Sequence, residues 1–141
     1  MKLLEDIGFW TQVRPRVLHR LPGRLRLRIP LLKRIPDDWL NVAEILERVI
    51  AAPQGIVSAR SDRRTGSLLI VYDADVLQES DILGFLHALL EMLRRNRDRL
   101  RGMPNGRAAR VARQLEKWVR AQTRQRPVFD PKVTIPDAIW S

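Results

Sequence analysis

The chain has 141 residues, 45% of them hydrophobic, which is enough for one domain with a core, and it has no run of the about 20 apolar residues that a membrane span requires. It contains no cysteine, which excludes disulfides, thiolate nucleophiles and every cysteine-based metal site. The net charge of +10 is concentrated in residues 93–126, which contain twelve basic and two acidic residues, while the rest of the chain is neutral. The expected partner is therefore a polyanion or an acidic protein surface.

Residues 1–13 precede the first predicted strand and form a segment of their own. Four apolar side chains recur there at helical spacing: Leu3, Leu4, Ile7 and Trp10. This spacing predicts a short amphipathic helix. Glu5 and Asp6 interrupt the apolar core that a signal peptide would need, so we expect a cytoplasmic protein.

The next segment contains the clearest strand pattern of the chain. Arg24 to Ile29 alternates strictly between arginine and an apolar residue, which predicts a strand with one apolar face and one arginine face. Pro22-Gly23 marks a turn or bulge before it, so Val17–Leu21 is expected as a second strand piece. The arginine face is either a solvated sheet surface or a surface that binds phosphate or carboxylate groups bidentately.

The middle of the chain predicts a helix, a hairpin and a second helix. Asp37-Asp38 can cap a helix that ends at Pro53-Gln54-Gly55. Two strands follow, Ile56–Ser61 and Ser67–Tyr72, joined by the turn residues Arg63 to Gly66. The second helix starts at Gln78 or Ser80, has a broad apolar face up to Leu93, and can continue to Arg101.

The C-terminal third is expected to lie outside the domain. Gly102 to Gly106 breaks the helical pattern, and a third, basic helix is predicted from Arg107 to about Gln125. Residues 127–141 contain three prolines and are expected to be extended. We therefore divide the chain into an N-terminal segment (1–13), a domain (14–92) that is expected to fold alone, a basic helical arm (93–126) and an extended docking tail (127–141).

The predicted order of elements is typical of an α+β, ferredoxin-like split βαβ sandwich, to which the basic helix and the tail are added. The order βαββα leaves the fourth strand undetermined. Val13–Leu21 or Lys132–Ile135 can fill that edge of the sheet.

Three runs of residues resemble a known family. They are His19-Arg20-Leu21-Pro22-Gly23-Arg24-Leu25-Arg26-Leu27-Arg28, Pro53-Gln54-Gly55-Ile56-Val57-Ser58-Ala59-Arg60 and Thr65-Gly66-Ser67-Leu68-Leu69-Ile70-Val71-Tyr72-Asp73. They look like the bacterial heavy-metal-associated-like domain, in its cysteine-lacking branch, over about residues 14–92. The resemblance implies a ferredoxin-like fold, in a domain that occurs alone or ahead of metal-pumping P-type ATPases.

The resemblance raises the question of a metal, and the residues argue against one. The metal-carrying branch uses a Cys-x-x-Cys pair in its first loop, since Cu(I) and Zn(II) prefer thiolate ligands. The matching loop here is expected to contain His19 and Pro22-Gly23, and the only other histidine is His87. We expect no metal site and no other cofactor.

No catalytic set is recognisable, so the chain is not expected to be an enzyme. Two histidines leave almost no partners for a triad, and Arg64-Thr65-Gly66-Ser67 is interpreted as a hairpin and not as a phosphate loop. The acidic residues at the predicted helix starts and turns have structural roles there.

The expected function is that of a non-catalytic adaptor that docks on a partner protein or larger assembly with an acidic surface. The residues expected to bind an anion or the partner are Arg24, Arg26, Arg28, Arg94, Arg95, Arg97, Arg99 and Arg101. The expected docking anchors are Trp118, Phe129, Ile139 and Trp140. Nucleic-acid binding through the basic arm and peripheral attachment to a membrane, as an accessory of metal transport, are alternatives, and a homo-oligomer is left open.

Overall fold

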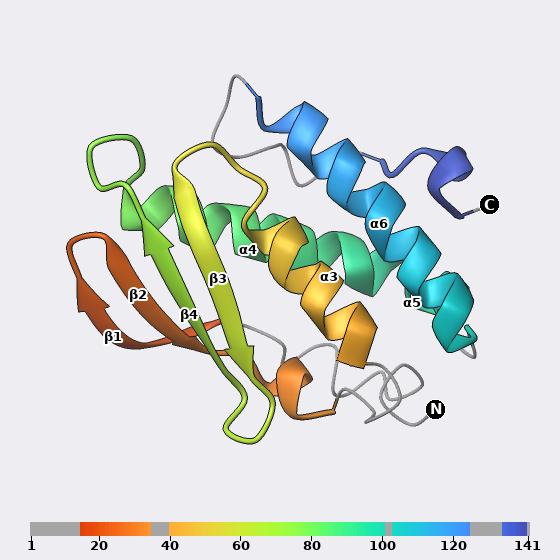
Figure 1. Ribbon diagram of the computed structural model, residues 1–141, viewed down its shortest axis with the longest axis horizontal. Coiled ribbons are helices and arrows are strands. Elements are labelled where there is room, and N and C mark those ends of the chain that lie inside the picture. Colours follow the sequence, from red (N-terminus) through yellow and green to blue (C-terminus); the bar gives the residue numbers. More distant parts are fainter. Residues whose placement is uncertain (1–14, 35–39, 101–102, 125–133, 141) are drawn as a thin grey trace.

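The computed structural model describes residues 15–34, 40–100, 103–124 and 134–140, and its elements are shown in Figure 1. The expected helix in residues 1–13 and the expected capping role of Asp37-Asp38 fall outside these ranges. The strands are β1 (Arg16–Leu21), β2 (Arg24–Arg28), β3 (Ile56–Asp62) and β4 (Ser67–Tyr72). The α-helices are α3 (Leu40–Ile50), α4 (Glu79–Arg95), α5 (Arg97–Leu100) and α6 (Asn105–Gln122), and Pro30–Arg34 (η1) and Asp137–Trp140 (η3) are short 3-10 helices.

The four strands form one antiparallel sheet in the order β1-β2-β4-β3. This confirms the α+β fold and answers the question of the fourth strand. The residues Arg16–Leu21, which come first in the chain, occupy the edge next to β2. Of the alternative segment, Lys132 and Val133 lie outside the described residues, and Thr134 and Ile135 are not in a strand.

Two predicted turns are confirmed, and glycine is required in both. Gly23 joins β1 to β2 with φ 77°, and a Cβ there would lie 3.0 Å from the carbonyl oxygen of Tyr72. The Tyr72 N–H donates to the Gly23 carbonyl over 3.0 Å, so this turn is also tied to β4. Gly66 closes the β3–β4 hairpin with φ 70°, and its N–H donates to Asp62 over 2.8 Å.

The core lies between the sheet and the helices that cover one of its faces. On β2, Leu25 and Leu27 are fully buried while the arginines on either side of them are exposed, as the alternation predicts. Buried side chains of α3 and α4 pack against this sheet face in the same cluster, among them Val49, Phe85 and Leu89. In Figure 1, α4 crosses behind the strands and α3 lies beside β3.

The second helix does not run on to Arg101, an extension that the sequence left open. It ends at Arg95, and Asn96 interrupts it because its side-chain amide donates to the Met92 carbonyl over 2.7 Å. The short α5 follows. In the described parts of the chain, no helix combines the length and the apolar composition that crossing a membrane requires.

Helix α6 packs against α3 and contributes to the same core. Its buried residues are Ala108, Ala109, Val111, Ala112, Leu115 and Val119. At the surface of this contact, Arg48 of α3 donates to Glu116 over 3.0 Å, and Arg120 donates to the same carboxylate over 3.3 Å. Burial raises the pKa of Glu116, but these two hydrogen bonds and the charges of both arginines outweigh it and leave the pKa below its ordinary value.

The small side chains of α6 explain this close packing. Three of its six buried residues are alanines, which let the helix backbone approach α3. Within the basic arm that the sequence predicts, Asn105–Gln122 is thus a helix with one apolar face in the core and one basic face outside.

Candidate functional site

The face of the sheet opposite the helices has an unusual concentration of arginine. The alternation of β2 places Arg24, Arg26 and Arg28 on this outer face, and all three are exposed. Strand pairing adds neighbours from the other strands: Arg26 lies between His19 of β1 and Leu69 of β4, and Leu69 is paired in turn with Arg60 of β3. We call Arg24, Arg26, Arg28 and Arg60 the arginine face.

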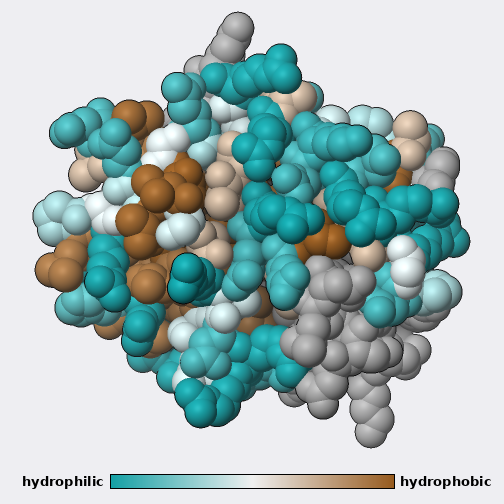
Figure 2. All heavy atoms as spheres, in the orientation of Figure 1, coloured by the Kyte–Doolittle hydropathy of each residue, from teal (hydrophilic) through white to brown (hydrophobic). Residues whose placement is uncertain are grey.

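An apolar column separates the arginines of β2 from Arg60. Leu69 and Val71 of β4 are half-buried on this outer face, next to Arg26 and Arg24 respectively. The exposed Leu21 flanks Arg24 on the other side. Figure 2 shows brown, apolar side chains on the left of the view, where the strands lie, surrounded by teal, hydrophilic ones. The surface therefore combines guanidinium groups with apolar area.

An open hollow of about 410 Å³ lies on this face. It is lined by Leu18, Arg26, Arg28, Arg60, Ser61, Asp62, Thr65, Ser67 and Leu69. Three of these residues are arginines of the arginine face, so an anionic group in the hollow would be within reach of donors from two strands.

The charges of the arginine face are not neutralised by the part of the chain that the structure describes. No ion pair joins any of its four guanidinium groups to a described acid. The lining of the hollow contains one acid, Asp62, whose carboxylate lies 3.9 Å from the Arg64 guanidinium and accepts a hydrogen bond from the Arg64 backbone N–H over 3.0 Å. A carboxylate or phosphate from outside would therefore meet unpaired cations.

Of the arginines predicted from the end of the second helix, those that the structure describes do not form a comparable surface. Arg94 pairs with Glu91 on the same helix, donating from Nε over 3.0 Å, and this hydrogen bond lowers the pKa of Glu91. Arg95 is exposed, while the Arg97 side chain and all of Arg101 fall outside what the structure describes. Arg99 contacts the C-terminal turn instead.

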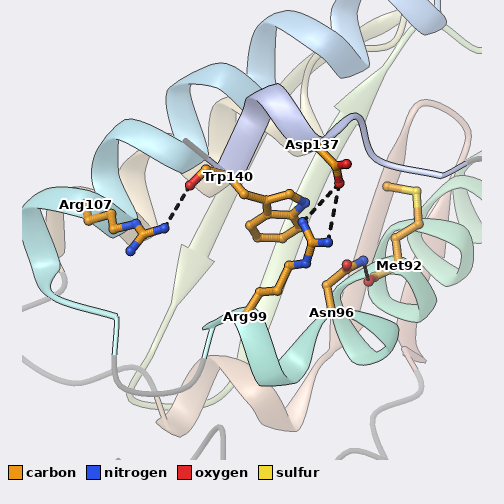
Figure 3. Close-up of polar contacts among 6 residues, drawn as sticks. All are labelled: Met92, Asn96, Arg99, Arg107, Asp137 and Trp140. Carbon is orange, nitrogen blue, oxygen red and sulfur yellow. Dashed lines mark hydrogen bonds and ion pairs between the residues drawn. The ribbon is translucent and has the colours of Figure 1, made fainter.

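The C-terminal turn is held by two arginines from elsewhere in the chain (Figure 3). The Arg99 guanidinium lies 5.4 Å from the centroid of the Trp140 ring and 3.3 Å from the Asp137 carboxylate. Arg107 donates to the Trp140 carbonyl over 2.9 Å. The described end of the tail, expected to be extended, is therefore a 3-10 turn docked on its own chain.

The predicted docking anchors are mostly occupied within the chain. Ile139 and Trp140 are each only 7% exposed and belong to the core cluster. Trp118 is half-buried and packs against that cluster, and Phe129 lies outside the described residues. Two of the arginines that were expected to bind the partner, Arg94 and Arg99, form ion pairs within the chain instead.

One residue of the arginine face was missed by the sequence reasoning, while the exposed bases of α6 were predicted as part of the basic arm. Arg60 joins the arginine face only through the pairing of β3 with β4, a long-range contact that no local pattern indicates. The bases of α6 belong to the predicted basic helix, and their spacing of three and four residues puts Arg110, Arg113, Lys117 and Arg120 on one side of it.

The described residues do not fit a bound metal ion. The run His19–Gly23, expected to match a metal loop, is the end of β1 and its turn into β2, and the segment that leads from β2 towards α3, residues 29–39, has neither histidine nor cysteine. His19 and His87 are exposed on different elements. In the described ranges, no three His, Asp or Glu side chains come together as a metal site would need.

Purified protein is accordingly expected to contain far less than one copper or zinc ion per chain after dialysis. The reason is the missing set of soft or imidazole ligands. Elemental analysis of the dialysed full chain measures this directly. Stoichiometric metal that disappears in His19→Ala, with His87→Ala as the matched control, would show that His19 recruits ligands after all.

Comparison with known protein families gives one result. The model of a family described as heavy metal associated domain 2 matches residues 11–138. Neither the curated proteins nor the solved structures contain a match. The matched range runs from β1 through α6 into η3, so it extends well beyond residue 92, where the resemblance in the sequence was expected to end.

Proposed function

Because the chain belongs to the heavy metal associated domain 2 family, we propose that it is a non-catalytic binding module that carries no metal and docks through its arginine face on an acidic partner protein. The observation that carries the proposal is the arginine face itself, four guanidinium groups around the apolar column Leu69 and Val71 that form no ion pair with a described acid. The docking surface is thereby assigned to the sheet, since the predicted anchors Ile139 and Trp140 are buried in the chain.

The composition of this face favours a protein over a nucleic acid. Protein interfaces are enriched in arginine, which adds apolar stem area to its charge, and depleted in lysine. The arginine face contains no lysine, and its arginines flank the apolar residues Leu69 and Val71. Proteins that bind single-stranded nucleic acid stack bases on sheet aromatics, and none of the described outer-face positions paired across β1, β2, β4 and β3 is aromatic apart from His19.

The size of the face sets the expected strength of binding. Four strands about 4.8 Å apart and about five residues long make a surface of roughly 15 by 17 Å. The area of this surface is therefore well below the roughly 800 Å² that each partner buries in a standard stable interface. We therefore expect a weak, salt-sensitive complex. Two copies would not pair through this face, because like charges would be brought together.

The proposal is tested with a short fluorescein-labelled peptide of alternating glutamate and leucine, which offers carboxylates and apolar side chains at strand spacing. Fluorescence anisotropy at physiological salt is expected to show binding to the full chain. The sheet variant R24Q/R26Q/R28Q is expected to bind about thirtyfold more weakly, since three partly exposed ion pairs are together worth roughly 2 kcal/mol.

The matched control is the helix variant R110Q/R113Q/K117Q, which removes the same charge from the exposed side of α6. It is expected to bind the peptide almost as the unmodified chain does. Equal losses in the two variants would mean that net charge alone attracts the peptide, and the arginine face would lose its role. Since the substituted basic residues are exposed, neither variant is expected to melt below the temperature of the parent.

A further inference from the structure

The exposed side of α6 is a second basic surface, distinct from the arginine face. Arg110, Arg113, Lys117 and Arg120 are all exposed and follow one another at intervals of three, four and three residues. We call these four residues the helix stripe. At a rise of 1.5 Å per residue the helix stripe is about 15 Å long, and Arg124, also exposed, follows just beyond the end of α6.

The helix stripe is unfavourable for the helix that carries it. Each neighbouring pair in it places like charges three or four residues apart, a spacing that destabilises helices. The first turn of α6 has no acidic residue that would interact favourably with the helix dipole, and it contains Arg107, whose positive charge is unfavourable at this end of a helix. In the described part of the chain, Arg120 has Glu116 as an acidic partner, whereas Arg110, Arg113 and Lys117 have none. Such a local conflict is expected where function requires it.

The chemistry of the helix stripe points to phosphate groups. The exposed large apolar residues of the described chain are Leu18, Leu21, Val57 and Val76, and none of them is on α6. The apolar side of α6 is already used in the core. Figure 2 shows a mostly teal surface over α6, at the upper right of the view. The stripe therefore lacks the apolar centre of a protein interface and the apolar face that a membrane-surface helix inserts.

We propose that the helix stripe binds the phosphate backbone of a nucleic acid without reading its bases. The helix stripe has four exposed cationic side chains, and each of them can contact one phosphate, so we expect about four phosphate contacts. Arginine donates two parallel hydrogen bonds to a phosphate, and lysine adds a point charge. Nothing on the stripe is suited to base edges, so binding is expected to be independent of sequence.

The two basic surfaces are separate in space. Helix α6 packs on α3, and the arginine face is on the side of the sheet that the helices do not cover. In Figure 1 the strands lie at the left and α6 at the upper right. A nucleic acid on α6 would leave the arginine face accessible, so binding at one surface does not exclude binding at the other.

The test uses fluorescein-labelled duplex and single-stranded oligonucleotides of mixed sequence, with the full chain, at salt concentrations from about 50 to about 200 mM. For the duplex, the slope of log affinity against log salt is expected to be about −3 to −4, which corresponds to about four phosphates. The helix variant R110Q/R113Q/K117Q removes three contacts. Its slope is expected to flatten by about 2 to 3, and its affinity at the lowest salt to fall at least tenfold.

The sheet variant R24Q/R26Q/R28Q is the matched control, and its slope is expected to change by less than about 1. Equal flattening in both variants would overturn the proposal, because it would show attraction by net charge. Phosphatidylserine vesicles form a further arm. Binding to vesicles that the helix variant loses, together with no oligonucleotide binding, would assign the stripe to a membrane surface and also overturn the proposal.

Folding is separated from binding by two further measurements. Since the helix variant removes repulsion between like charges, its melting temperature is expected to equal or exceed that of the parent. The variant R110K/R113K keeps the charges and is expected to keep the salt slope. A slope lost in R110K/R113K as well as in the helix variant would contradict binding through backbone phosphates.

Discussion

Residues 14–92 expressed alone are expected to lose the cooperative unfolding transition of the full chain, contrary to the independent folding that the sequence pattern favours. The reason is that α6 and the C-terminal turn share one core with the sheet. Removing them exposes the α3 surface that Leu115 and Val119 cover and deletes Ile139 and Trp140 from the cluster. Each large apolar side chain contributes about 1.5–3 kcal/mol by burial, so the sum reaches the 5–15 kcal/mol by which whole domains are stable.

Circular dichroism during heating measures this expectation, with the full chain as the reference. A broad, non-cooperative melt and binding of a hydrophobic dye are the expected results for residues 14–92. A sharp transition within a few degrees of the full chain would show that the helical layer beyond residue 92 adds little to the fold. The basic arm would then be an appendage, as first expected.

Trp140→Ala is expected to destabilise the monomer by about 2–4 kcal/mol, although it changes the next-to-last residue of the chain. Trp140 is 7% exposed, and its ring faces the guanidinium of Arg99 at 5.4 Å. The substitution removes both the buried area and this cation–π contact, which is worth about 0.5–1 kcal/mol or more. Thermal unfolding of the full-length variant is expected at a temperature lower by about 5 °C or more.

Trp140→Phe is the matched control, since it keeps an aromatic ring in the same place and is expected to lose less than half as much stability. The structure predicts that Trp140→Ala leaves binding of the acidic peptide nearly unchanged at a temperature where the variant is folded. An unchanged melt combined with lost peptide binding would instead make Trp140 an anchor for the partner.

Local patterns in the sequence predicted most of the sheet. The alternation from Arg24 to Ile29, the turns at Gly23 and Gly66 and the two hairpin strands all appear in the structure. These features depend on side-chain period and backbone conformation, which are properties of neighbouring residues. The three arginines of β2 were identified for the same reason.

The features that the sequence did not predict depend on contacts between segments that are distant in the chain. An apolar helix face, such as that of α6, looks the same in sequence whether it packs on its own chain or on a partner. Trp140 presented the same ambiguity, because a buried aromatic anchor can pack on its own chain or on a partner. The sequence offered Val13–Leu21 as one of two candidates for the sheet edge, and strand pairing decides for it. The place of Arg60 on the arginine face also follows from strand pairing.

The most direct test of the arginine face is a map of where the acidic peptide binds. Amide proton–nitrogen spectra of the full chain would be recorded as the glutamate–leucine peptide is added at physiological salt. We expect shifts to concentrate on β2 and β4, at and beside Arg24, Arg26 and Leu69, and to vanish in R24Q/R26Q/R28Q. Shifts that concentrate on α6, or that persist unchanged in this variant, would contradict the proposal that the chain docks through its sheet.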